Sequence, residues 1–128
     1  MTKNKEYQQI SDAEYEIMKI IWQYKRIKAS DIIQNVDKDF NWNDRTIKTM
    51  LNRLLKKNVI SYDKDGKSYI YYSLVNEEDY KSIESKTFIK KVFDGSLISM
   101  FSSFLKESDL SKKEIDDLKK LLEEKEDN

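Results

Sequence analysis

The chain has 128 residues, of which 38% are charged, and its 24 Lys and Arg balance its 24 Asp and Glu at pH 7. It contains no cysteine and no histidine, which excludes disulfides, thiol redox chemistry, zinc fingers and every mechanism that needs an imidazole. The carboxylates show no EF-hand spacing and no apolar run is long enough to span a bilayer, so we expect a soluble cytoplasmic protein without a cofactor or metal.

The charges are unevenly distributed along the chain. Residues 1–75 carry 14 Lys and Arg against 10 Asp and Glu, a net charge of +4, whereas residues 76–128 carry 10 against 14, a net charge of −4. Binding to nucleic acid depends on where charge lies rather than on the total. The sequence therefore predicts a DNA-binding domain over residues 1–75 and a separate helical domain over residues 76–128.

The first predicted helix starts at a capping box, in which Ser11 is the N-cap and Glu14 bonds back to it. Apolar residues follow at helical spacing and indicate a largely buried helix. We interpret its aromatic residues as core rather than as a ligand-stacking surface: Tyr15, Trp22 and Tyr24. A second, shorter helix is expected over residues 29–36, with a weak start because Lys28 is a poor cap.

The most informative stretch is residues 43–57, where Asn43 is the expected N-cap. Its apolar residues recur at the spacing of one buried helical stripe: Ile47, Met50, Leu51, Leu54 and Leu55. The opposite side carries basic and short hydrogen-bonding side chains: Arg45, Thr46, Lys48, Thr49, Asn52, Arg53 and Lys56. For an isolated helix, a solvated basic face is an equally good interpretation. Two short helices joined by a compact turn, the second of them basic outside, instead indicate a helix-turn-helix.

The residues after this helix narrow the type of fold. Two stretches rich in β-branched and aromatic residues, 59–62 and 68–73, flank an Asp-Gly pair that suits a tight hairpin turn. A recognition helix followed by a hairpin predicts a winged helix. Lys64 and Lys67 at the tip are expected to lie against a phosphate backbone, and ordinary solvation of the turn is the alternative.

The acidic half is expected to form three amphipathic helices, the first capped by Asn76 and the last opened by a second capping box at Ser111. About fifty residues in three helices cannot easily bury so many large apolar side chains in a core of their own. We therefore expect these helices to pack against a second copy of the chain. The residues expected at this dimer interface are Ile83, Phe88, Ile89, Val92, Leu97, Phe101, Phe104, Leu105, Ile115, Leu118, Leu121 and Leu122.

These elements match a known family in the right order and over nearly the whole chain. Residues 43–57 resemble the recognition helix of the BlaI/MecI penicillinase and methicillin-resistance repressors, and residues 13–22 resemble their first helix. Residues 71–74 are similar to the end of their wing, and residues 86–92 and 110–118 are similar to their C-terminal helices. The fold class expected is thus mainly α with a small β-wing, in which a winged helix-turn-helix precedes a three-helix dimerisation region.

The resemblance implies a homodimeric repressor that occupies a palindromic operator in double-stranded DNA and blocks a β-lactamase or related resistance operon. It also implies release by proteolysis, in which a membrane-bound sensor metalloprotease cuts the dimerisation region. The family's scissile Asn-Phe bond falls here at Ser103-Phe104, and the Ser in place of Asn leaves the exact site, the inducer and the protease open. Copper-responsive relatives carry a cysteine-rich motif near the C-terminus, which this chain lacks.

In the DNA contacts that we expect, Thr46, Thr49 and Asn52 lie nearest the bases. The basic side chains Arg45, Lys48 and Arg53 divide between guanine edges and phosphates. The alternatives are a repressor of the same family that responds to another signal, a winged-helix adaptor that binds protein, and an enzyme. No Gly-rich phosphate loop, Ser-x-x-Lys motif or positioned carboxylate pair favours an enzyme.

Overall fold

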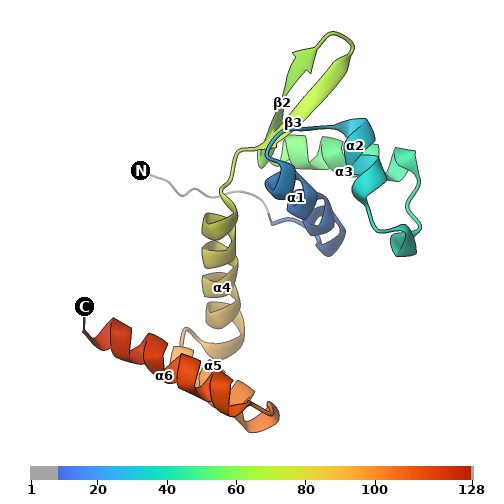
Figure 1. The fold of residues 1–128 in the computed structure, drawn as a ribbon. Helices are drawn as coiled ribbons and strands as arrows, with labels where there is room; N and C mark the ends of the chain where they lie inside the picture. The colour runs from blue at the N-terminus through green and yellow to red at the C-terminus, as the bar shows by residue number, and fades with distance from the viewer. Residues whose placement is uncertain (1–8, 128) are drawn as a thin grey trace. The chain divides into compact units, whose positions relative to one another are not determined.

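The computed structural model describes residues 9–127, which form six α-helices and a three-stranded antiparallel sheet (Figure 1). The chain divides into two compact units, of which the first ends at Lys81 and the second begins at Ser82. This boundary falls inside helix α4 (Glu77–Phe93), whose first turn belongs to the first unit. The mainly helical class with a small β-wing is confirmed.

Helix α1 (Asp12–Tyr24) begins at the predicted capping box. The Glu14 backbone N–H donates to Ser11 Oγ at 3.1 Å, and the Ser11 N–H donates to Glu14 Oε1 at 2.9 Å. The helix is buried along most of its length, as its apolar pattern predicted. Tyr24 was wrongly placed in the core: it is 45% exposed, because it lies in the last turn and its hydroxyl donates to the exposed Asn35 Oδ1.

A two-residue strand, β1 (Ile27–Lys28), leads directly into helix α2 (Ala29–Asn35). The sequence did not predict β1, because two residues are too few to show strand alternation. No side chain caps α2, in agreement with the poor cap expected at Lys28. A 3₁₀ turn, η1 (Lys38–Phe40), follows, and the rings of Phe40 and Trp42 stack at 4.5 Å.

Helix α3 (Asp44–Lys56) is capped as predicted, since the Thr46 N–H donates to Asn43 Oδ1 at 2.8 Å. Strands β2 (Ile60–Asp65) and β3 (Ser68–Ser73) form the predicted hairpin, and β1 pairs with the other edge of β3. The second strand has the predicted bounds, but β2 begins one residue later than expected and extends to Asp65, so that the turn is only Gly66 and Lys67. Gly66 has φ +62, a conformation that glycine adopts without a Cβ penalty.

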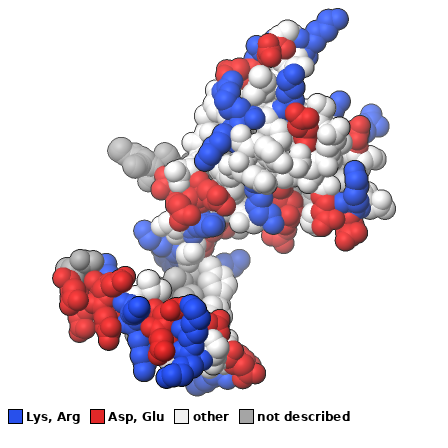
Figure 2. Space-filling model, in the orientation of Figure 1, with Lys and Arg blue, Asp and Glu red and all other residues white. Residues whose placement is uncertain are grey.

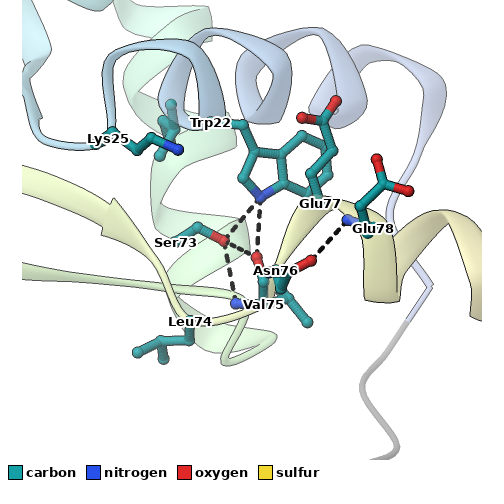
Figure 3. Close-up of a pocket in the computed structure, with 9 residues that line it drawn as sticks. Trp22, Lys25, Ser73, Leu74, Val75, Asn76, Glu77 and Glu78 are labelled. Atoms are coloured by element: carbon teal, nitrogen blue, oxygen red, sulfur yellow. Dashed lines mark hydrogen bonds between the residues drawn. The ribbon is translucent and has the colours of Figure 1, made fainter.

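Near the end of the first unit, β3 passes into α4 beside Trp22 (Figure 3). The indole Nε1–H donates to Ser73 Oγ at 3.1 Å and to the Val75 carbonyl at 2.9 Å. The Asn76 side chain accepts from the Glu78 N–H at 2.8 Å, as expected of an N-cap. Tyr80 is buried against Trp22, so the start of α4 is packed into the core of the first unit.

The second unit contains the rest of α4 with helices α5 (Leu97–Glu107) and α6 (Lys112–Glu126). Gly95, at φ +83, ends α4 by donating its N–H to the Ile89 carbonyl at 3.0 Å. Ser111 forms the predicted capping box with Glu114. Not one residue of α5 or α6 is buried over the described range. Among residues 9–127, none of the helices has the length and apolar content to cross a bilayer.

Candidate nucleic-acid interface

Helix α3 presents two different faces. Its apolar stripe packs into the core, where Ile47, Met50, Leu51 and Leu54 are each at most 4% exposed, and Leu55 is half-buried beside them. The opposite face is exposed at every position that the sequence singled out: Arg45, Thr46, Lys48, Thr49, Asn52, Arg53 and Lys56. One helix thus carries all seven side chains on its solvent side, while its opposite face packs against the core.

Lys57, directly after α3, does not share this exposure. Its Nζ lies 2.6 Å from Glu14 Oε1 and donates to the Gln9 carbonyl at 3.0 Å, and the side chain is only 20% exposed. Burial raises the pKa of the Glu14 carboxyl, but the bonds from Lys57 and from the capping box outweigh it and hold that pKa below its usual 4.5. The carboxylate is therefore ionised at neutral pH and engages one of the five basic residues of 45–57.

The four cations that belong to α3 itself differ from Lys57. Within residues 9–127, Arg45, Lys48, Arg53 and Lys56 form no ion pair. Cations with no internal partner, set among threonine hydroxyls and an asparagine amide, can bind phosphates and base edges without first breaking a contact. The arrangement suits an α-helix that enters a major groove.

The wing formed by β2 and β3 has two chemically different faces. Tyr62 pairs with Tyr71 and Lys64 with Tyr69, so these four side chains share the inner face, which continues into the core at Ile60. The outer face carries acidic residues: Asp63 and Asp65. In the view of Figure 2, Lys and Arg side chains extend from the wing with Asp and Glu side chains between them.

The acidic outer face is partly neutralised within the unit. Arg26 Nη2 lies 2.7 Å from Asp63 Oδ2, and its guanidinium stacks 5.2 Å from the centre of the Tyr72 ring. Lys64 and Lys67, the two wing residues predicted to meet phosphate, are exposed and form no ion pair within the described residues. The wing therefore keeps both lysines available for a polyanion.

A groove of about 400 Å³ lies between the start of α2, the exposed face of α3 and strand β3. It brings two predicted residues of α3, Lys48 and Asn52, together with the predicted wing residue Lys67. It also contains residues that the sequence did not single out, among them Lys28, Ser30 and Tyr69. Only the pairing of β1 with β3 brings Lys28 here, so no local pattern could have indicated it.

In the part of the chain that the structure describes, the carboxylates do not come together as a metal site. No group of three or more Asp or Glu side chains over residues 9–127 is placed to hold a metal ion. Glu14, the one buried acidic residue of that range, is engaged by Lys57 and Ser11. The exposed face of α3, by contrast, carries cationic and hydrogen-bonding side chains and no carboxylate between Arg45 and Lys56.

The second unit presents a different candidate interface, which is apolar. Ten of its large hydrophobic side chains are between 36% and 78% exposed: Phe88, Val92, Leu97, Ile98, Phe101, Phe104, Leu105, Ile115, Leu121 and Leu122. Ile83, Ile89 and Leu118 are half-buried. Ser103 and Phe104 are exposed residues inside α5, so the peptide bond between them is helical.

Comparison with known proteins gives consistent matches. Residues 10–124 match the family described as penicillinase repressor. The chain is 39% identical over 120 residues to the penicillinase repressor of Bacillus licheniformis, and this alignment covers 94% of each protein. It is 43% identical over 122 residues to the methicillin resistance regulatory protein MecI of Staphylococcus aureus (strain N315), which covers 95% of this chain and 98% of the relative.

Two solved structures resemble the first part of the chain. The solution structure of the DNA-binding domain of the repressor BlaI matches with a TM-score of 0.53 and 40% identity, over 60% of this chain and 94% of that one. The monomeric form of B. licheniformis BlaI in complex with the blaP half-operator matches with a TM-score of 0.51 and 40% identity, over 59% and 92% of the two chains. The second of these relatives was thus solved bound to DNA.

Proposed function

The chain belongs to the penicillinase repressor family, and from this premise we propose that it acts as a homodimer that occupies a palindromic operator and is inactivated by cleavage of its tail. It is a DNA-binding winged-helix transcriptional repressor of the β-lactam resistance type and not an enzyme. The relatives that it matches over almost their whole length are repressors of this type. The observation that carries operator binding is the exposed face of α3, with four cations that have no ion-pair partner in the described chain.

In the complex that we propose, α3 lies in the major groove of double-stranded DNA. Thr46, Thr49 and Asn52 are nearest the bases, where short side chains can meet a thymine methyl group or an adenine edge. The longer cations reach guanine edges and phosphates: Arg45, Lys48, Arg53 and Lys56. Lys64 and Lys67 of the wing contact the sugar–phosphate backbone and so fix the register of α3.

Dimerisation through the second unit supplies the second half-site. The exposed apolar side chains of α4, α5 and α6 have no core in the described chain, and a second copy would cover them. A dimer presents two α3 helices about 34 Å apart, or a multiple of that distance, on one side of the duplex. Linkage raises the effective concentration of the second contact to roughly the mM range, so dimer loss weakens binding without altering any base contact.

Cleavage in α5 is the proposed route of derepression. The bond between Ser103 and Phe104 lies inside α5, so a cut there separates α6 and the last turn of α5 from the rest of the apolar surface. The proposed partner is a membrane-bound sensor metalloprotease, which acts on the repressor in the cytoplasm. Because Ser103 stands where the family has Asn, a repressor of the same family that answers another inducer or protease is the second candidate.

The proposal is tested by gel shift of the full chain on the DNA upstream of its own gene. Thr49→Ala is expected to reduce the preference for operator over scrambled DNA by about tenfold, as loss of a base contact does. Arg53→Ala is expected to weaken both complexes uniformly and to lower the salt dependence. Binding that is insensitive to salt in the wild type would instead indicate a protein-binding adaptor.

The dimer is tested separately by sedimentation of the full chain over a range of concentrations. Phe101→Glu places a charge in the apolar surface of α5 and is expected to shift the protein to monomer. Lys106→Glu, which changes the charge of an exposed polar residue of the same helix, is the matched control and should leave the dimer intact. A wild type that sediments as a monomer at every concentration contradicts the proposal.

A further inference from the structure

The groove beside α3 is built from three elements that are distant in sequence. Lys28 and Ser30 come from β1 and the start of α2, Lys48 and Asn52 from α3, and Lys67 and Tyr69 from the wing. It has a volume of about 400 Å³, and no acidic residue lines it. Concave, cationic surfaces of this kind concentrate positive potential and select for an anion.

The three lysines of the groove have no ion-pair partner in the described structure. Across the part of the chain that the structure describes, Lys28, Lys48 and Lys67 form no ion pair. Lys28 and Lys67 lie outside α3, so they add cations that the helix itself does not carry. Cations arranged beside a recognition helix, rather than on it, are placed for the phosphates that flank the groove.

One wall of the groove is aromatic. The Tyr69 ring lines it and is 39% exposed, while Tyr62 stacks on Tyr69 with ring centres 4.2 Å apart. Tyr71, which is buried, meets Tyr69 edge-on at 6.5 Å. A ring that its neighbours already hold in place loses little side-chain entropy when a ligand packs against it.

This groove has lysines on some sides and an aromatic ring on another. The two match the two parts of a nucleotide backbone, which are phosphate and deoxyribose. We propose that the backbone of one operator strand lies in this groove, with Lys28 and Ser30 as phosphate contacts that α3 does not supply and the Tyr69 ring packed against a deoxyribose. Tyr62 acts as a positioning residue that supports Tyr69. The inference rests on the proposed function, because it assigns further contacts of the same DNA-binding surface.

The test is fluorescence anisotropy of the full chain on a labelled duplex from upstream of its own gene, at several KCl concentrations. Lys28→Gln is expected to lower the slope of log affinity against log salt by about 0.9 and to weaken binding about threefold at moderate salt, as one lost phosphate contact does. Tyr69→Ala is expected to weaken binding on the order of tenfold without changing that slope, because the contact is apolar. Tyr69→Phe keeps the ring and should bind within about twofold of wild type.

Matched controls separate this inference from the proposed function. Lys25→Gln removes one charge three residues before Lys28, from a residue that lines a different pocket (Figure 3), and should leave the salt slope unchanged. Thermal unfolding of each variant verifies that it is folded. If Arg53→Ala weakens binding while Lys28→Gln and Tyr69→Ala bind like wild type, the groove assignment is overturned and the function stands. If Arg53→Ala also binds like wild type, the proposed function itself fails.

Discussion

Helices α3 and α5 are both amphipathic, but only α3 finds a core within its own unit. Leu54 of α3 is fully buried among residues of α1 and the sheet, whereas Ile98 of α5 is 78% exposed. In α3 the packing of the apolar stripe fixes the helix and leaves the polar face for recognition. In α5 the apolar face is itself the exposed surface, which soluble proteins seldom keep open over a large area.

The comparison concerns how much apolar surface each unit buries within one chain. Burial of apolar surface contributes roughly 25 cal/mol per Å², so the free energy that stabilises the first unit is available within one chain. The corresponding contribution in the second unit is mostly unrealised, since its large apolar side chains remain exposed. We therefore expect the stability of the first unit to be independent of protein concentration and that of the second to rise with it.

The largest expected effect tests the core of the first unit. Leu54→Ala removes a fully buried side chain and should lower the free energy of unfolding by about 3 kcal/mol, because it leaves a cavity among well-packed neighbours. Urea denaturation followed by tryptophan fluorescence reports it, since Trp22 and Trp42 both lie in this unit. Leu122→Ala, at a position that is 65% exposed, is the matched control and should leave this transition unchanged. A Leu54 effect that varies with protein concentration would contradict the comparison.

The ion pair between Glu14 and Lys57 should give the next largest effect. Glu14→Gln leaves Lys57 without its charge partner in a largely buried site and should cost roughly 1–3 kcal/mol at pH 7. Folding lowers the pKa of Glu14, so the folded protein binds fewer protons than the unfolded chain. The ionised carboxylate therefore contributes its full stabilisation above about pH 4.5. It is lost as the pH falls through the lowered value. Urea denaturation of wild type and variant between pH 7 and pH 3 should therefore show a difference that shrinks in acid.

The control for this pair is Glu16→Gln. Glu16 pairs with Lys19 on the exposed side of α1, where both side chains are about a third exposed or more, so its loss should change stability little. A difference between wild type and Glu14→Gln that persists unchanged at pH 3 would mean that packing of the side chain, and not its charge, stabilises the unit.

Much of this structure could be predicted from local sequence. Asn43, Ser11 and Ser111 mark helix starts because capping depends on residues within one turn, and the stripe of α3 is read from spacing alone. The pairing of Glu14 with Lys57 joins residues 43 apart, and the groove joins three elements through β1. Such contacts depend on the tertiary fold, so the sequence pattern counted Lys57 among the basic residues of 45–57 and overlooked Lys28 and Tyr69.

Two helix N-caps, Asn43 of α3 and Ser96 of α5, allow the two units to be compared through smaller changes in stability. Asn43→Ala removes the cap of α3 and should lower the stability of the first unit by about 1 kcal/mol at every protein concentration. Ser96→Ala removes the bond to the Ser99 N–H that caps α5, and its effect should be confined to the concentration-dependent transition. Circular dichroism during thermal unfolding, at two protein concentrations, distinguishes the two outcomes. Equal effects of both variants on one single transition would show that the units unfold together.

The smallest expected effect concerns the outer face of the wing. Arg26 and Asp63 lie 2.7 Å apart, but their side chains are 53% and 56% exposed, so solvent and salt screen the pair. Arg26→Ala should therefore cost less than about 1 kcal/mol, and the double variant with Asp63→Ala should show a coupling energy of no more than about 0.5 kcal/mol. Urea denaturation of the four proteins of this cycle measures it. A larger coupling energy would mean that the ion pair on the acidic outer face stabilises the position of the wing. Its position beside α3 would then depend on Arg26 as well as on the buried tyrosine of the inner face, and Arg26→Ala would weaken DNA binding without contacting DNA.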